Sequence, residues 1–262
     1  MSGDWANGKA YEPYVGRWSR LVAAEFLAWL DAPAHKRWID FGCGTGALTS
    51  AILSRARPES VLGIDPSPEY IALASENNLD PRARFKVGEA TNLSPSSAHV
   101  LVSGLVLNFL PDPASALALM RRALVEGTGG IVAAYVWDYS DKMELMRYFW
   151  DAAIALDSGA RDIDEGKRFP MCRPDALTTL WQEAGLSQVT TSAIDVPTLF
   201  RDFDDYWKPF LGGQGPAPSY ALSLSEERRD ALRDRIRSQL PVSADGSIHL
   251  IARAWAVQGR SA

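Results

Sequence analysis

The residues with the clearest chemical potential form a glycine-rich segment that begins at Asp40. An apolar run ends there, and Gly42, Gly44 and Gly46 follow at alternate positions before a helix is expected. Glycine accepts positive φ angles and allows a ligand to lie against the main chain. The start of a helix directs free N–H groups at an anionic or polar group. The segment therefore predicts a loop that holds a cofactor.

Further polar and small residues stand where the next three apolar runs end. Asp65 lies 19 residues after Gly46, where a carboxylate can accept hydrogen bonds from both hydroxyls of a ribose. The third run leads into Gly88-Glu89-Ala90, which supplies another carboxylate. The fourth ends at Ser103-Gly104, where small side chains permit close approach of a ligand.

Asp40 is the residue that discriminates between possible cofactors. Gly42, Gly44 and Ala47 also satisfy the loose glycine pattern of a dinucleotide site. A carboxylate next to this loop, however, would repel a pyrophosphate and attract an ammonium or a sulfonium. S-adenosylmethionine carries both cations, together with a ribose for Asp65 and an adenine amino group for a carboxylate such as Glu89. We therefore predict S-adenosylmethionine as the cofactor.

The elements that must position these residues alternate between strand and helix. Apolar runs predict strands over residues 37–41, 60–64, 83–87, 100–105 and 131–137. Helical spacing predicts helices over residues 48–55, 68–77 and 113–125 between them. This rhythm predicts an α/β fold with a doubly wound, parallel sheet that is covered by helices on both faces.

The rhythm breaks after residue 137. A helix over residues 174–184, a strand over 188–196 and a last strand over 248–257 are expected beyond it. We predict a single domain over residues 1–262, with an N-terminal helical element over 1–32 and a core over about 33–137, 174–196 and 247–258. The two aromatic-rich insertions, 138–173 and 197–246, are expected to form a lid above the strand ends.

The run Ile39–Gly46 resembles motif I of class I S-adenosylmethionine-dependent methyltransferases, the type found in quinone-biosynthesis C-methyltransferases and related small-molecule enzymes. The resemblance covers about residues 37–137. It implies a mostly parallel, seven-stranded sheet whose last strand, here 248–257, is antiparallel. Tyr11–Ser19 is similar to the N-terminal element of a subgroup of uncharacterised bacterial methyltransferases. His99 and Asn108 depart from the family, which often has Asp and His there.

The resemblance also implies a role for each part of the cofactor site. Three loops at strand ends would hold the methionine part, the ribose and the adenine, and a fourth would line the methionine and acceptor side. Two N-terminal residues would fold over the cofactor, Arg17 meeting its carboxylate. In this order, the residues are Asp40, Gly42, Cys43, Gly44, Thr45 and Gly46; Asp65, Pro66 and Ser67; Gly88, Glu89 and Ala90; Ser103, Gly104 and Leu105; and Tyr14 with Arg17.

Composition limits the kinds of partner. The chain has 32 acidic and 27 basic residues, a net charge of −5, which does not favour nucleic acid or an anionic membrane. Cys43 and Cys172 are too few for a disulfide framework, and residues 1–9 lack the apolar core of a signal peptide. The histidines and cysteines are too scattered for a metal site. We expect a cytoplasmic protein with a small-molecule partner.

The predicted reaction is an in-line displacement at the methyl group, which depends mainly on alignment of the two reactants. An acidic acceptor can ionise unaided, so no general base is required, and the sequence identifies none. Asp138 and Tyr139, directly after the fifth strand, are the candidates considered for that role. Two alternatives stay open: a non-catalytic protein that binds S-adenosylmethionine, and an NAD(P)-dependent oxidoreductase.

Overall fold

The structure, a computed structural model, describes residues 16–212 and 215–261 of the chain. These residues form two compact units. The first, here called the helical unit, comprises residues 16–18, 137–172 and 195–254, apart from 213–214. The second, here called the sheet unit, comprises residues 19–136, 173–194 and 255–261.

The strands form a seven-stranded sheet with the order β3-β2-β1-β4-β5-β7-β6, in which six strands are parallel and the last strand along the chain is antiparallel. This confirms the predicted fold class. The long strands β6 and β7 continue from the sheet unit into the helical unit. The strands are β1 (Arg37–Phe41), β2 (Ser60–Asp65), β3 (Ala83–Val87), β4 (Val100–Gly104), β5 (Ile131–Trp137), β6 (Ser187–Phe200) and β7 (Ile248–Arg260).

β6 extends beyond the strand that was predicted over residues 188–196. The predicted strand ends before Pro197, but Thr198 and Phe200 continue its alternation of buried and exposed side chains. β6 is the edge strand of the sheet. Proline is tolerated at an edge because the missing N–H need not face a neighbouring strand. The second insertion therefore begins after Phe200.

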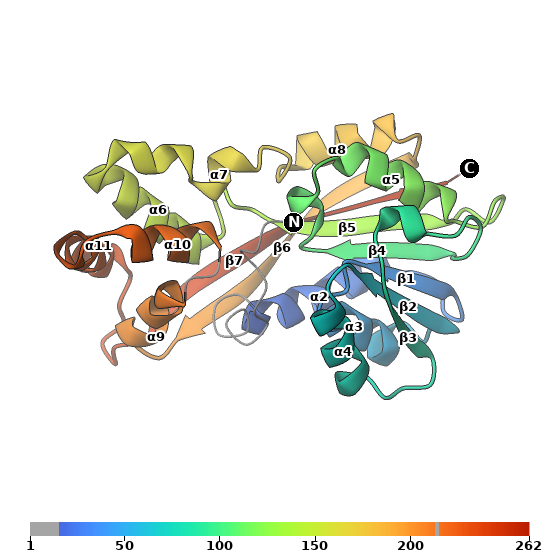
Figure 1. Cartoon of the computed structure of the whole chain (residues 1–262), viewed down its shortest axis with the longest axis horizontal. Helices are drawn as coiled ribbons and strands as arrows, with labels where there is room; N and C mark the ends of the chain where they lie inside the picture. Colours follow the sequence, from blue (N-terminus) through green and yellow to red (C-terminus); the bar gives the residue numbers. More distant parts are fainter. Residues whose placement is uncertain (1–15, 213–214, 262) are drawn as a thin grey trace. The chain divides into compact units, whose positions relative to one another are not determined.

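Helices cover both faces of the sheet unit. In Figure 1, α5 and α8 lie above the strands, and α3 and α4 lie below them. Short 3-10 helices η3 (Ala90–Asn92) and η4 (Leu107–Phe109) follow β3 and β4. The helices that belong wholly or mainly to this unit are α2 (Arg17–Leu30), α3 (Ala47–Arg55), α4 (Pro68–Asn77), α5 (Pro113–Arg122) and α8 (Pro174–Glu183).

β5 forms the centre of the core. All seven of its residues are buried, as expected for a strand that is covered on both faces. The Phe26 ring of α2 packs against Tyr135 of β5 with 4.8 Å between the ring centres. Trp181 of α8 donates its Nε1–H to the Val132 carbonyl at 3.0 Å. Aromatic side chains thus fix two helices against one strand.

Side-chain caps determine where α4 and α5 begin. The Ser67 hydroxyl accepts a hydrogen bond from the Tyr70 amide at 3.3 Å, and the Asp112 carboxylate accepts one from the Ser115 amide at 2.9 Å. A proline follows each cap at the first helical position, where its lack of an N–H costs nothing. Both helices therefore start close to the end of the preceding strand or loop.

The register of the parallel strands gathers the predicted site residues at one edge. Asp40 of β1 lies opposite Gly63 of β2 and opposite Val102 of β4. Asp65 of β2 lies opposite Val87 of β3. The carboxyl ends of four strands meet at this edge, which is where open α/β sheets bind their ligands.

The helical unit has an aromatic core of its own. Phe149 stacks on Phe210 with 4.6 Å between ring centres, and the Tyr206 hydroxyl donates to the Leu145 carbonyl at 2.7 Å. Trp150 is fully buried, so these aromatics pack this unit. A lid function for them stays a prediction. The unit contains α6 (Glu144–Leu156), η5 (Ser158–Asp162), α7 (Glu165–Arg168), α9 (Phe203–Trp207), η6 (Lys208–Leu211), α10 (Pro216–Ser223) and α11 (Glu226–Gln239).

None of the helices in the described part of the chain has the length and apolar character needed to cross a membrane.

Candidate cofactor site

The glycine loop after β1 is held against β2 by main-chain hydrogen bonds. The amides of Gly42 and Cys43 both donate to the Ile64 carbonyl, at 2.7 and 3.1 Å. Gly42 has a φ of +72°, and a Cβ at this position would stand 2.6 Å from a Val106 methyl group. Only glycine fits here, because both the backbone conformation and the contact with Val106 exclude a side chain.

Gly44 differs from Gly42 in what surrounds it. Its φ is +52°, and a Cβ placed on it would meet no atom of the described residues within 4 Å. The main chain is therefore accessible at this point of the loop. A ligand can lie against Gly44 without a side chain between them, as the sequence predicted for a cofactor loop.

Asp65 ties the glycine loop to the start of α4. Its Oδ2 accepts a hydrogen bond from the Gly44 amide at 3.0 Å, and its Oδ1 accepts one from the Ser67 amide at 2.9 Å. The side chain is almost fully buried, and this burial raises the pKa of the Asp65 carboxyl. Each carboxylate oxygen has further acceptor capacity, so the predicted contact with a ribose remains compatible with these bonds.

Asp40 is a buried carboxylate. Its Oδ2 accepts a hydrogen bond from the Thr49 hydroxyl of α3 at 2.7 Å. Its Oδ1 is buried and has no hydrogen-bond partner among the residues that the structure describes. Burial raises the pKa of Asp40 to about 7. A cation near the unpaired oxygen would favour the ionised form, which is the electrostatic role that the sequence assigned to this residue.

The loop after β3 is linked to β2 by a main-chain hydrogen bond. The Gly88 amide donates to the Asp65 carbonyl at 3.0 Å. The Glu89 amide donates to the Asn92 side chain at 2.7 Å, while Glu89 itself is exposed. Ala90 begins η3. Glu89 is thus available to a ligand, and its contact with adenine stays a prediction.

The polar side chain at the end of β4, Ser103, is hydrogen-bonded within the sheet. The buried Ser103 hydroxyl donates to the Phe41 carbonyl of β1 at 2.8 Å. A Cβ on Gly104 would stand 2.5 Å from the Tyr135 hydroxyl. Leu105 has a φ of +61°, which is uncommon for a residue with a side chain. These three residues shape the chain beside the glycine loop, and Ser103 acts first as a tie between strands.

The remaining predicted residues of the sheet unit lie in the same two loops. Cys43 is buried, and burial raises the pKa of its thiol far above the usual range, so it is unreactive at neutral pH. Thr45 and Pro66 are partly buried within their loops. None of them has a contact that tests its role toward a cofactor.

Two polar residues of this edge were not included in the predicted site. Thr49 is fully buried as the partner of Asp40, and its position three residues after Gly46 was the available signal. Asn108 of η4 is also buried, and neither its Oδ1 nor its Nδ2 has a hydrogen-bond partner. Buried amides are seldom left unpaired in native proteins, so Asn108 belongs among the candidate ligand contacts.

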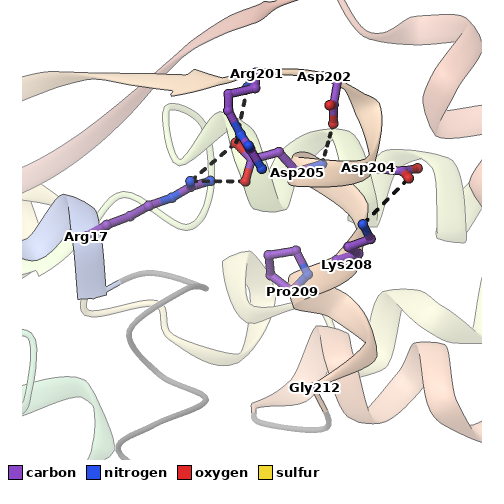
Figure 2. A pocket seen from close by; sticks show the side chains of 8 residues that line it. All are labelled: Arg17, Arg201, Asp202, Asp204, Asp205, Lys208, Pro209 and Gly212. Atoms are coloured by element: carbon purple, nitrogen blue, oxygen red, sulfur yellow. Dashed lines mark hydrogen bonds and ion pairs between the residues drawn. The ribbon is translucent and has the colours of Figure 1, made fainter.

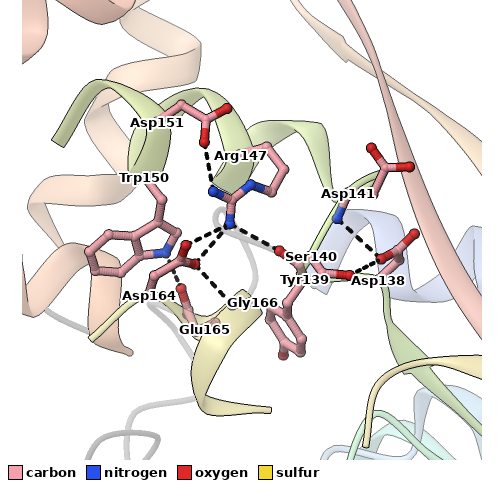
Figure 3. Close-up of polar contacts among 10 residues, drawn as sticks. All are labelled: Asp138, Tyr139, Ser140, Asp141, Arg147, Trp150, Asp151, Asp164, Glu165 and Gly166. Atoms are coloured by element: carbon pink, nitrogen blue, oxygen red, sulfur yellow. Dashed lines mark hydrogen bonds and ion pairs between the residues drawn. The ribbon is translucent and has the colours of Figure 1, made fainter. Parts of the chain in front are cut away.

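The candidate bases lie in a polar cluster of the helical unit, which Figure 3 shows. Asp138 is buried and accepts hydrogen bonds from the Ser140 hydroxyl at 3.1 Å and the Asp141 amide at 3.2 Å. The Tyr139 ring packs against Phe169. Both residues therefore have structural partners, and a role as general base stays a prediction.

Glu165 of the same cluster was not singled out from the sequence. It is buried and accepts a hydrogen bond from the Trp150 indole N–H (Figure 3). Burial raises the pKa of Glu165 to about 7. Its neighbour Asp164 pairs with Arg147 at 2.8 Å. The sequence offered no signal for Glu165, because an acid in a polar insertion is normally exposed.

Of the two N-terminal residues predicted to cover the cofactor, Tyr14 lies outside the described residues. Arg17 lies in the helical unit, where its Nη1 contacts both carboxylate oxygens of Asp205, at 3.3 and 3.4 Å (Figure 2). The predicted contact of Arg17 with the cofactor's carboxylate is not tested by this pairing.

Among the described residues, no group of three or more His, Cys, Asp or Glu side chains is arranged to hold a metal ion.

Comparisons with known proteins show similarity to methyltransferases. A family model described as a methyltransferase domain matches residues 39–127. Trans-aconitate 2-methyltransferase from Methylobacterium radiotolerans is 34% identical over 136 residues, which make up 52% of this chain and 50% of that protein. Ubiquinone biosynthesis O-methyltransferase from Burkholderia pseudomallei is 29% identical over 187 residues, 68% of this chain and 77% of that protein.

The chain is therefore similar to methyltransferase domains over residues 39–127. Its fold is similar to that of phosphoethanolamine N-methyltransferase 2 from Haemonchus contortus, solved with S-adenosyl-L-methionine, with a TM-score of 0.55 and 16% identity over 90% of this chain and 52% of that chain. The chain spans about half the length of the trans-aconitate relatives it matches. The matched segment contains residues 39–41 of β1, all of β2 to β4, and every predicted site residue except Tyr14 and Arg17.

Proposed function

We propose that this chain is an S-adenosylmethionine-dependent methyltransferase that transfers a methyl group to a small-molecule acceptor. The observation that carries the proposal is the accessible backbone of Gly44 beside two buried acids, Asp40 and Asp65. The family match and the names of the relatives support it, since trans-aconitate and ubiquinone precursors are small molecules. Two free cysteines and the net charge of −5 support a cytoplasmic protein that does not bind nucleic acid.

The residues at the sheet edge fit this cofactor. The methionine part would lie on the loop Gly42–Gly46, with Asp40 beneath it. Asp65, with Pro66 and Ser67, would hold the ribose, and Glu89, with Gly88 and Ala90, would face the adenine. Ser103, Gly104 and Leu105 would line the acceptor side. Support comes from the unpaired Oδ1 of Asp40 and from the open space at Gly44.

The residues of the chain contribute alignment and electrostatics rather than bond-making groups. The bound cofactor supplies an electrophilic methyl group on a sulfonium. Asp40 in its ionised form attracts positive charge, and it is only partly ionised near its pKa of about 7. Binding of a cation is therefore expected to strengthen as the pH rises through 7. Positioning of the two reactants then supplies several kcal/mol of the barrier reduction.

A non-catalytic protein that binds S-adenosylmethionine is the second candidate. The same geometry is consistent with it, because Asp40, Gly44 and Asp65 concern the cofactor and do not identify an acceptor. An oxidoreductase with a nicotinamide cofactor is the weaker alternative, since the buried Asp40 would stand near its pyrophosphate.

A transfer assay separates the first two candidates. The protein is incubated with methyl-labelled S-adenosylmethionine and a metabolite pool below 1 kDa, and label is followed into the pool together with release of S-adenosylhomocysteine. A labelled product that requires the protein supports the methyltransferase. Tight cofactor binding without transfer to any component would favour the non-catalytic protein. A Gly44→Ala variant provides the matched control.

A further inference from the structure

The amino ends of β1, β2 and β3 carry polar side chains at the opposite ends of these strands from the candidate cofactor site. Arg37 begins β1, Ser60 begins β2, and Arg84 is the second residue of β3. In the parallel register, Arg37 lies opposite Ser60, and Arg84 lies opposite Leu62. Side chains alternate between the two faces along a strand, and residues opposite each other in a parallel pair share a face. Since Leu62 is two residues after Ser60, all four side chains project from one face of the sheet.

This face of the sheet unit is accessible over the three strands. Asp40 is three residues after Arg37, so it projects from the other face, where α3 packs and Thr49 donates a hydrogen bond to it at 2.7 Å. The connection from β3 to β4, which the structure describes throughout, contains the three-residue η3 as its regular element. Arg37 and Leu62 are accordingly partly exposed, although β1 and β2 are inner strands of the sheet. A ligand can therefore reach this face.

A pocket with a volume of about 360 Å³ lies on this face, a size that suits a small molecule. Its lining combines two arginines and two serines with an apolar part, and no acid of the described residues belongs to it. The polar members are Arg37, Ser60, Arg84 and Ser97, and Leu62 belongs to the apolar part. This lining contrasts with the net charge of −5 of the whole chain, and it favours a negatively charged ligand.

Both arginines of the pocket keep donors for a ligand. Arg37 donates its Nε–H to the Ser97 carbonyl at 3.2 Å, and this bond holds the guanidinium at the pocket wall. The two terminal nitrogens of Arg37 have no partner among the described residues and are not fully buried, so a ligand can reach them. Arg84 is exposed, and the described part of the chain offers it no hydrogen bond or ion pair. Two guanidiniums therefore present free donors on the same face.

The two arginines specify an anion with several oxygens. A guanidinium is a planar fork that matches two oxygens of a carboxylate or a phosphate. A phosphate monoester has three terminal oxygens and about two negative charges above pH 7, so it can pair with two guanidiniums at once. β1 and β3 are separated by β2 and are about 10 Å apart, a span that two long side chains can close from both sides. Leu62 of β2 leaves an apolar surface between them for the body of the ligand.

We propose that this pocket is a second ligand site, which binds a phosphate monoester with an apolar body. Arg37 and Arg84 pair with the phosphate oxygens, and Leu62 contacts the apolar body. The site is distinct from the candidate cofactor site, because Arg37 begins β1 whereas the glycine loop follows the other end of this strand. Both sites lie in the sheet unit. The inference does not rest on the proposed function.

Calorimetry of the whole chain at pH 8, in a phosphate-free buffer, tests the ligand chemistry. Phenyl phosphate is expected to bind, and inorganic phosphate, which lacks the apolar body, should bind at least fivefold more weakly. Benzoate keeps the ring but has two oxygens and one charge, so it should also bind at least fivefold more weakly. Failure of phenyl phosphate to bind would overturn the proposal. An affinity of either comparison anion equal to that of phenyl phosphate would overturn the assignment to an apolar phosphate monoester.

Arg84→Gln locates the site. Arg84 has no partner to lose among the described residues, so the variant should fold like the wild type and bind phenyl phosphate at least tenfold more weakly. Ser60→Asp should weaken binding by a similar factor, because the introduced carboxylate repels the phosphate. Arg55→Gln is the matched control, since Arg55 is an exposed arginine of α3 in the same unit and does not line the pocket. Equal affinities in Arg84→Gln and Arg55→Gln would overturn the proposal, as would an unchanged affinity in Ser60→Asp.

A competition titration separates this site from the cofactor site. In the presence of saturating S-adenosylhomocysteine, the affinity for phenyl phosphate is expected to stay unchanged. Displacement of phenyl phosphate by S-adenosylhomocysteine would place it on the glycine loop and would overturn the proposal. If the chain binds phenyl phosphate through Arg84 but does not bind S-adenosylhomocysteine, the second site is supported and the proposed function is contradicted instead.

Discussion

At the scale of single residues, the two buried acids near the glycine loop have different tasks. Both carboxylate oxygens of Asp65 accept hydrogen bonds from backbone amides, and these bonds hold the loop in its conformation. Asp40 has one oxygen paired with Thr49 and one unpaired, so it keeps electrostatic capacity for a ligand. The sequence predicted the positions of both acids. It could not predict these bonds, because they depend on how β1, β2 and α3 pack.

The raised pKa of Asp40 predicts how stability depends on pH. Since the pKa rises from 3.8 to about 7 on folding, the folded state holds a proton that the unfolded state loses between these values. The stabilising contribution of Asp40 to the free energy of unfolding is therefore fully present below about pH 4 and is lost as the pH rises through 7.

We expect Asp40→Asn to reduce this loss. Between pH 5 and pH 8, the free energy of unfolding of the wild type should fall by about 2 kcal/mol or more relative to that of the variant, at 1.36 kcal/mol per pKa unit. Urea unfolding at both pH values measures it. Asp175→Asn, which changes an exposed acid, should follow the wild type. Parallel curves for wild type and Asp40→Asn would contradict the assigned burial.

Gly44 provides a second prediction at this scale. Alanine there meets no atom within 4 Å but must adopt a φ of +52°, which costs about 1–2 kcal/mol. The variant should fold and should bind S-adenosylmethionine at least tenfold more weakly, because the methyl group enters the space left for the ligand. Calorimetry and urea unfolding measure the two effects.

Gly127→Ala is the matched control for Gly44→Ala. Gly127 has a φ of +67° and likewise nothing within 4 Å, but it lies in the loop between α5 and β5. The two variants should lose similar stability, and only Gly44→Ala should lose affinity. Equal affinities in both would show that no cofactor lies on the loop.

At the scale of elements, the bounds of strands and helices could be predicted wherever they depend only on residues close together in the sequence. β1, β3, β5 and α4 have the predicted bounds, since apolar runs and the proline after Ser67 define them. β6 runs further than expected because its place at the sheet edge, which tolerates Pro197, depends on the order of all strands. The pairing of Arg17 with Asp205 was equally hidden, because the two residues are 188 positions apart.

The ion pair between α6 and the N-cap residue of α7 leads to a prediction about the helical unit. Arg147 contacts Asp164 at 2.8 Å, where both side chains are largely buried, and Asp151 at 2.7 Å, where the acid is 65% exposed. Removing the partner of a buried charge is costly, whereas an exposed pair contributes little. Asp164→Asn should lower the free energy of unfolding by about 2–3 kcal/mol.

Asp151→Asn is the paired control and should lower stability by less than about 0.5 kcal/mol. Urea unfolding at neutral pH, followed by tryptophan fluorescence, measures both variants. Equal losses would mean that the two carboxylates share the guanidinium evenly, contrary to their difference in burial.

At the scale of the whole molecule, the fold is similar to that of methyltransferases, while the reaction depends on the residues of the site. The seven-stranded sheet places glycines and acids at one edge, within the segment that matches a methyltransferase domain. A fold alone does not fix an activity, because one fold supports many functions. The central claim is therefore that this edge binds S-adenosylmethionine.

Calorimetric titration of the purified chain with S-adenosylmethionine, S-adenosylhomocysteine and NADH tests this claim most directly, beside an Asp65→Asn variant whose folding is checked by circular dichroism. We predict micromolar binding of the first two ligands, no binding of NADH, and at least tenfold weaker binding in the variant, or about 1.4 kcal/mol. Binding of NADH alone, or unchanged affinity in Asp65→Asn, would contradict the account.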